Sequence, residues 1–229
     1  MKEQAGPKAC AGCGALVPDA EGPTHRYIGA SPGCWAAYGR LSKKEASDFR
    51  FMRHHQLTVD AYCVQHPGEP SPQSIRSVAV HLVGLHLQLE RETPTEGLYT
   101  ARKRIASLGK EGKLDLVWLE PPTSMGGITV LRALETEDAD EYGKVARVWA
   151  ESVWEAWSAY HENVRRWGSP PPRRRRRLVP ARSRLQRRRR RGQEAPLLHK
   201  GSQTYSGGRL EIREHTATGT ATGLVRAST

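Results

Sequence analysis

The chain has 229 residues, of which 37% are hydrophobic, and its formal net charge is +12. This charge is unevenly distributed, because residues 1–168 contain 20 Lys and Arg against 21 Asp and Glu, whereas residues 169–229 contain 16 against 3. The composition therefore argues against a uniformly basic domain with a shaped nucleic-acid surface, and it divides the chain into a nearly neutral domain, 1–168, and a basic tail, 169–229.

The predicted elements begin after a long irregular segment. The first 34 residues are rich in Gly and Pro and show no hydrophobic period, so we expect an irregular loop there. Because this loop contains little apolar material, it needs another interaction to hold it in place. Hydrophobic spacing then predicts helices in the following ranges: 35–49, 57–66, 72–89, 96–108 and 138–167. Between the last two, LDLVWLEPP and GGITVLRAL are short and apolar, and each fits a strand or an extended segment. The predicted fold class is therefore mainly α, a helical bundle with an irregular N-terminal loop.

The clearest of these helices is 72–89. Ser71 is a favourable N-cap, and Pro72 suits the first helical position. Apolar residues then recur at alternating spacings of three and four, which places them on one stripe: Ile75, Val78, Leu82, Leu85 and Leu89. The segment 138–167 keeps the same period and contains four tryptophans, which we expect to pack in the core.

The tail differs from everything before it. The stretch GSPPPRRRRRLVPARSRLQRRRRRGQEAP has no apolar periodicity, and its charge density opposes collapse, so we expect disorder. One hypothesis is a frameshifted or non-homologous extension. The other is an arginine-rich arm that contacts nucleic acid weakly and non-specifically through phosphates. Tyr205 is its single aromatic residue, so base stacking is not expected.

The expected cellular compartment is inferred from the lack of a secretory signal and of a membrane-spanning segment in the sequence. The N-terminus MKEQAGPKA has no apolar core of the kind that a secretory signal needs. The most apolar run, VAVHLVGLHLQL, is too short to cross a bilayer and contains two histidines. We therefore expect a soluble, cytoplasmic protein with no membrane contact, in which thiols stay reduced and are free to bind metal.

Three of the four cysteines lie near the N-terminus and form a candidate metal site. Cys10 and Cys13 make a C-x-x-C pair, and Gly14 behind them can adopt the positive φ of a zinc knuckle. Cys34 comes at the start of a predicted helix, where the N-terminal dipole favours a thiolate. The sequence therefore predicts three thiolate ligands for a zinc ion.

The fourth ligand is less well defined. His25 lies in the same loop and gives the spacing C-x2-C-x11-H-x8-C, so we predict His25, with His66 and His81 as rivals for the place. A redox function is a weaker alternative, because no strand of useful length precedes Cys10. A third interpretation is that the thiols bind no metal. Cys63 lies inside a predicted helix, where we expect a small buried apolar residue.

A second group of polar residues lies further along the chain. His55, Asp60 and His66 are near the second predicted helix, and His81 is on the third. Asp60, His66 and His81 are candidate catalytic residues, because an acid and two imidazoles in one groove could hold a metal with an open position or act as acid and base. The competing interpretation is a set of hydrogen-bonded residues that fix helix packing. The chain has no P-loop, GxGxxG, G-x-S-x-G or H-E-x-x-H motif.

Several unusual strings occur together and in order: CAGCGALVP, GPTHRYIGASPGCW, LTVDAYCVQHPG and WLEPP. On these strings, residues 8–167 resemble an uncharacterised prokaryotic family known only as a domain of unknown function. The resemblance implies a pattern that contains the following residues: Cys10, Cys13, His25, Cys34, Asp60, His66 and His81. It implies no activity or substrate, it leaves Cys63 outside the pattern, and it leaves the basic tail unmatched.

Three hypotheses for the function result. The first is a binding or regulatory protein with a structural zinc ion, since an irregular loop of this length cannot stabilise itself by burial alone. The second is a metal-dependent, hydrolase-like enzyme that uses Asp60, His66 and His81. The third is nucleic-acid binding through the tail. The sequence identifies no substrate and no partner.

Overall fold

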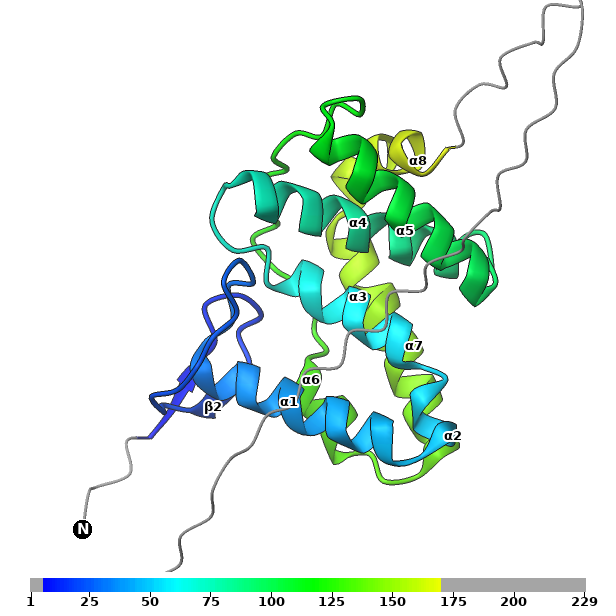
Figure 1. Ribbon diagram of the computed structural model, residues 1–229. Helices are drawn as coiled ribbons and strands as arrows, with labels where there is room; N and C mark the ends of the chain where they lie inside the picture. Colours follow the sequence, from blue (N-terminus) through cyan, green and yellow to red (C-terminus); the bar gives the residue numbers. More distant parts are fainter. Residues whose placement is uncertain (1–5, 170–229) are drawn as a thin grey trace, which may run out of the picture. The chain divides into compact units, whose positions relative to one another are not determined.

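A computed structural model describes residues 6–169 of the chain (Figure 1). The described part is mainly α-helical, which confirms the predicted fold class. Its strands are β1 (Pro7–Ala9) and β2 (Leu16–Pro18). Its helices are α1 (Pro32–Ser47), α2 (Phe49–Met52), α3 (His55–Gln65), α4 (Pro72–Leu89), α5 (Thr95–Lys110), α6 (Val130–Glu135), α7 (Ala139–Ala156), the 3-10 turn η1 (Ser158–Tyr160) and α8 (His161–Gly168).

Helix α3 lies in the middle of the bundle (Figure 1). It packs against α4 on one side and α7 on the other, and α4 in turn contacts α5 and α8. Helix α1 contacts α2 and α6 and approaches α3. The largest fully buried apolar side chains come from α1, α3, α4, α5, α7 and α8 and from the residue after α7: Trp149, Trp157, Trp167, Tyr62, Tyr142, Leu41, Leu82, Leu85 and Ile105. The core is therefore continuous from α1 to α8.

The start of α4 confirms the predicted cap. The Ser71 hydroxyl accepts a hydrogen bond from the Ser74 backbone N–H at 3.1 Å, which satisfies one of the free N–H groups of the first turn. Val78 and Leu82 of the predicted stripe are 3% and 0% exposed, so this stripe is the face that α4 turns to the core.

The predicted helix 138–167 is interrupted, which corrects the prediction of one long helix. Helix α7 ends at Ala156, and the chain passes through η1 before α8 begins. The His161 ring stacks on the Trp154 ring at 3.7 Å and bonds to the Trp154 carbonyl at 2.9 Å, which stabilises the bend. The bend lets the buried Trp157 indole donate to the Val64 carbonyl of α3 at 3.3 Å. All four tryptophans of this segment are buried, as predicted.

The two ambiguous segments and the N-terminal loop differ in detail from the prediction. Residues 114–122 form neither helix nor strand, and helix α6 takes up the second half of GGITVLRAL. The loop is largely irregular, but β1 and β2 pair as a short antiparallel hairpin, with Lys8 opposite Val17. A three-residue strand thus precedes Cys10, although it is too short to change the arguments against a redox motif.

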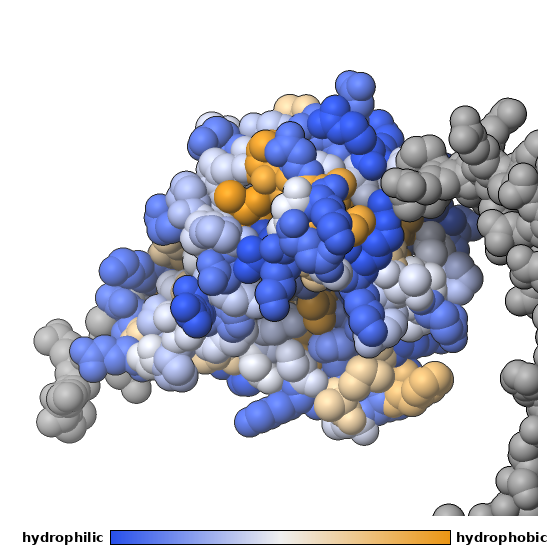
Figure 2. All heavy atoms as spheres, turned by 45° about the horizontal axis from the view of Figure 1, so that its top comes forward, coloured by the Kyte–Doolittle hydropathy of each residue, from blue (hydrophilic) through white to orange (hydrophobic). Residues whose placement is uncertain are grey.

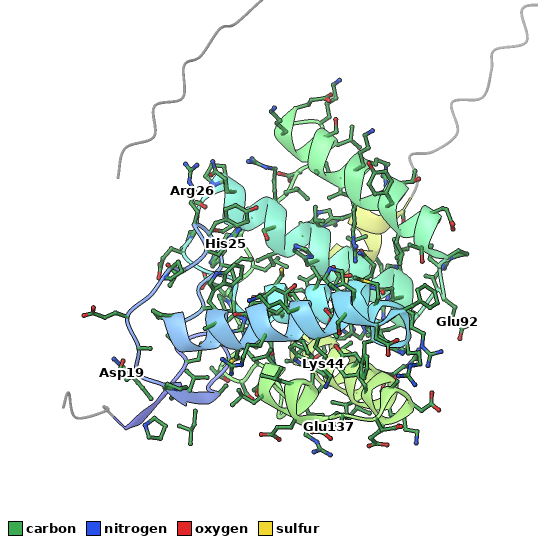
Figure 3. The ribbon with its side chains drawn as sticks, turned by 60° about the horizontal axis from the view of Figure 1, so that its bottom comes forward. Asp19, His25, Arg26, Lys44, Glu92 and Glu137 are labelled. Atoms are coloured by element: carbon green, nitrogen blue, oxygen red, sulfur yellow. The ribbon has the colours of Figure 1, made fainter. Side chains whose placement is uncertain are left out.

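Lys44 joins α1 to the connection after α6. Its ammonium donates to the carbonyls of Leu134, at 3.2 Å, and of Thr136, where the helix has no further N–H to offer. It also lies 5.0 Å from the Phe51 ring and 5.2 Å from the Tyr142 ring, a cation–π arrangement. Figure 3 shows Lys44 between α1 and the helices below it. This tie helps to fix the position of α1, whose first turn carries Cys34.

The visible face in Figure 2 is covered mainly by hydrophilic residues, with small groups of hydrophobic ones between them. None of the helices within residues 6–169 combines the length and the hydropathy that a bilayer crossing requires.

Candidate metal centre

A tight turn places the first two cysteines side by side. The hairpin of β1 and β2 closes with a hydrogen bond from the Cys10 backbone N–H to the Ala15 carbonyl at 2.8 Å. Gly14 donates to the Cys10 carbonyl at 2.8 Å and has φ +74°, the left-handed conformation that the sequence predicted for it. The side chains of Cys10 and Cys13 therefore point into one buried site, with exposed fractions of 2% and 9%.

The third and fourth side chains come from the start of α1 and from the residue that follows α3. Cys34 lies in the first turn of α1 and is completely buried. His66 directly follows α3 and is 1% exposed. The loop reaches α3 because glycines allow a close approach: the Gly29 N–H bonds to the His66 carbonyl at 3.1 Å, and a Cβ on Gly12 would overlap the His66 ring.

The ligand atoms of Cys10, Cys13, Cys34 and His66 all lie within 4.8 Å of one another. Cys13 Sγ is 3.8 Å from Cys34 Sγ, and Cys34 Sγ is 3.4 Å from His66 Nε2. Ligands that sit about 2.0–2.3 Å from a zinc ion at tetrahedral corners are about 3.5–3.8 Å from each other. The thiols are far beyond the disulfide bond length of about 2.05 Å, and all are free. In this Cys3His cluster, the Cys13–Cys34 and Cys34–His66 separations are thus close to those of a tetrahedral metal site.

A second set of groups orients these ligands. The Nδ1–H of His66 donates to the Tyr62 carbonyl at 2.7 Å, which makes Nε2 the ring atom that a metal beside the sulfurs would take. The Ser31 N–H points to Cys10 Sγ at 3.4 Å, and the Tyr62 hydroxyl to Cys34 Sγ at 3.7 Å. Such N–H and O–H donors stabilise thiolate sulfur and fix its position around an ion.

The electrostatics of the cluster favour a bound cation. Hydrogen bonds from the Cys13 and Cys34 thiols hold the pKa of Cys10 far below its usual range, and the same contacts with Cys10 and Cys13 raise the pKa of Cys34. Burial lowers the pKa of His66, but its bonds to Cys10 and Cys13 outweigh this and raise it to about 9. Three thiolates cannot coexist at this distance without a positive charge, so a divalent ion would hold all of them deprotonated.

His25, the predicted fourth ligand, lies outside the cluster. Its ring is half-buried, 4.4 Å from the Tyr27 ring and 5.2 Å from the Trp35 ring, and its Nδ1 accepts from the Tyr27 N–H at 3.5 Å. Figure 3 shows it beside Arg26 on the N-terminal loop. The histidine that lies beside the three sulfurs is His66, one of the two rivals named from the sequence, with Nε2 3.4 Å from Cys34 Sγ.

Asp60 and His81 form a separate pair between α3 and α4. Asp60 is completely buried, and its carboxylate accepts from His81 Nδ1 at 2.8 Å, from Gln88 Nε2 at 2.7 Å and from Arg102. Asp60, His66 and His81 do not form a metal-ligating group within residues 6–169, where the Cys3His cluster is the one such group. His66 belongs to that cluster, so the three candidate catalytic residues are not brought together. Cys63 is buried and lies outside the cluster, as expected.

His55 belongs to a third network. Its Nδ1 bonds to Glu45 at 2.7 Å, and Glu45 is completely buried. The same carboxylate accepts from the Thr58 and Tyr142 hydroxyls, each at 2.6 Å. The hydrogen bond to Glu45 raises the pKa of His55 above its usual value. Both carboxylate oxygens of Glu45 accept hydrogen bonds, so this network holds α1, α3 and α7 together.

A cleft of about 500 Å³ adjoins the Cys3His cluster. Four parts of the chain line it: residues 10–14 of the cysteine loop, Gly29, residues 67–69 after α3, and residues 121–126. Its walls are mostly backbone and small side chains, with Glu69 as the one acidic residue among them. The cluster therefore shapes one wall of the cleft.

The fold and the cluster define a helical protein with a candidate metal centre that joins its N-terminal loop to its central helix. The model of a family of unknown function, DUF5946, matches residues 8–158, and the chain belongs to this family. No curated protein and no solved structure matches the chain. The basic tail, with its predicted disorder and its predicted contact with nucleic acid, lies outside the described residues.

Proposed function

We propose that the Cys3His cluster binds one zinc ion and that this ion is structural. The observation that carries the proposal is the burial of all four ligand atoms within 4.8 Å of one another. Three thiolates and one imidazole are a ligand set that favours zinc, and four protein ligands leave no open position for water or substrate. Reduced thiols in such a site suit a reducing compartment, so we propose the cytoplasm.

We further infer a binding or regulatory role rather than catalysis at the metal. The closed ligand set supports this, and so does the cleft of about 500 Å³ beside it, which is within the range of about 300–1,000 Å³ of ligand sites. The ion would fix residues 10–14, and with them one wall of the cleft. Binding at this wall would therefore depend on the metal without direct contact between metal and ligand.

The test is metal analysis of the full chain purified without chelator. We expect about one zinc per chain, and removal of zinc by a strong chelator should lower the unfolding temperature and be reversed by added zinc. Protein that folds normally with no bound metal would refute the proposal. Zinc that exchanges rapidly with weak chelators and leaves the unfolding temperature unchanged would refute the structural role.

A further inference from the structure

A second cavity, of about 250 Å³, lies beside α4 and shares no lining residue with the Cys3His cluster. Its polar lining comes mainly from α4 and includes Gln73, Arg76, Ser77 and His81, with Tyr27 added from the N-terminal loop. Gln73, Ser77 and His81 are spaced by four residues, so they follow one another along the same face of the helix. This polar row lies apart from the apolar stripe of α4, which faces the core.

The imidazole of His81 is held in place by a buried partner. Its Nδ1–H donates to Asp60 at 2.8 Å, and its ring forms part of the cavity lining. Burial lowers the pKa of His81, but the neighbouring Cys63 and the bond to Asp60 outweigh this and raise it to about 10. Arg102 binds the same carboxylate, so Asp60 is fully paired and presents no free negative charge to the cavity.

Arg76 adds a second cationic group to the lining. It is half-buried, and within residues 6–169 its guanidinium has neither an ion pair nor a hydrogen bond. The carbon stem of Arg76 packs close to Gly109 at the end of α5, which limits its freedom. No Asp or Glu lines the cavity. The guanidinium donors of Arg76 are thus open to a ligand, and an oxyanion is the partner that they fit best.

We propose that this cavity binds a small oxyanion, the phosphate or carboxylate group of a small molecule. Arg76 would provide two parallel N–H donors, and His81 Nε2, the Ser77 hydroxyl and the Gln73 amide would complete the set. The volume of about 250 Å³ lies below the range of about 300–1,000 Å³ for drug-sized ligands, so the ligand is a small metabolite rather than a nucleotide.

The test compares the thermal stability of the full chain in inorganic phosphate, in acetate and in chloride at equal ionic strength. We expect phosphate or acetate to raise the unfolding temperature above its value in chloride, and the more effective anion identifies the ligand class. Arg76→Gln should weaken the affinity by about tenfold or more, because it removes a charge-assisted contact. Ser77→Ala, which removes one hydroxyl and leaves both charges, should weaken it only a few-fold.

Arg132→Gln is the matched control, since Arg132 is exposed on α6 and is not part of the cavity lining. The tail has the same charge in every variant, so its contribution cancels in the comparison. Equal stability in all three salts would overturn the proposal. Equal losses in Arg76→Gln and Arg132→Gln would also overturn it, because they would show non-specific screening. An unchanged metal content in Arg76→Gln separates this result from any failure of the zinc site.

Discussion

Replacement of His66 by Ala tests the composition of the metal centre most directly. The variant removes one of four ligands and leaves the three thiols in place. Structural zinc sites provide an apparent binding free energy of about 10–16 kcal/mol, so one of four ligands accounts for roughly 2.5–4 kcal/mol. This corresponds to a loss of zinc affinity of roughly 100-fold to 1,000-fold. At saturating zinc the free energy of unfolding should fall by a similar amount.

The assay is competition for zinc between the full-length protein and a chromophoric chelator, together with urea unfolding. His66→Cys should retain most of the affinity, since a thiolate replaces the imidazole, and this variant separates ligation from packing against the Tyr62 ring, 4.2 Å away. His25→Ala is the matched control and should bind zinc as the wild type does. Wild-type affinity in His66→Ala, or an equal loss in His25→Ala, would refute the proposed ligand set.

Three further predictions concern the fold. Asp138→Ala should lower the free energy of unfolding by about 0.5–2 kcal/mol in urea, because the Asp138 carboxylate caps two N–H groups at the start of α7. Gly84→Ala should cost about 1–3 kcal/mol in the same assay, since a Cβ there would overlap the Asp60 carboxylate; an unchanged midpoint would contradict this packing. Glu45 raises the pKa of His55 in the folded state, so the pair of Glu45 with protonated His55 stabilises the fold fully below the ordinary histidine pKa of about 6.5. This stabilisation is lost as the pH rises through the pKa of His55 in the folded state. The difference in unfolding temperature between wild type and His55→Gln should therefore shrink toward alkaline pH.

The helices could be predicted because their signals are local. The Ser71 cap and the apolar stripe behind it define α4 within the chain segment itself. The bend at Trp157 could not be predicted, because helical spacing continues through it. It depends on the contact of Trp157 with Val64 of α3, a residue 93 positions away. Tertiary packing therefore decides where α7 ends.

The candidate metal centre also has a part that the sequence could predict and a part that it could not. Cys10, Cys13 and Cys34 follow from short spacing and a helix start, which are properties of one loop. The place of His66 depends on how that loop folds back onto the end of α3, through the bond between Gly29 and the His66 carbonyl. Spacing favoured His25 because it is nearer in sequence, whereas the fold brings the more distant histidine to the sulfurs.

The different origins of the four ligands have a consequence for the order of assembly. The thiols lie within 25 residues of chain, so an incompletely folded chain can already gather them around an ion. The imidazole becomes available only once α3 has formed and its end has met the loop. At the proposed zinc site, affinity should therefore rise in the last stage of folding, so that tight retention of zinc would distinguish a finished molecule from a partly folded one.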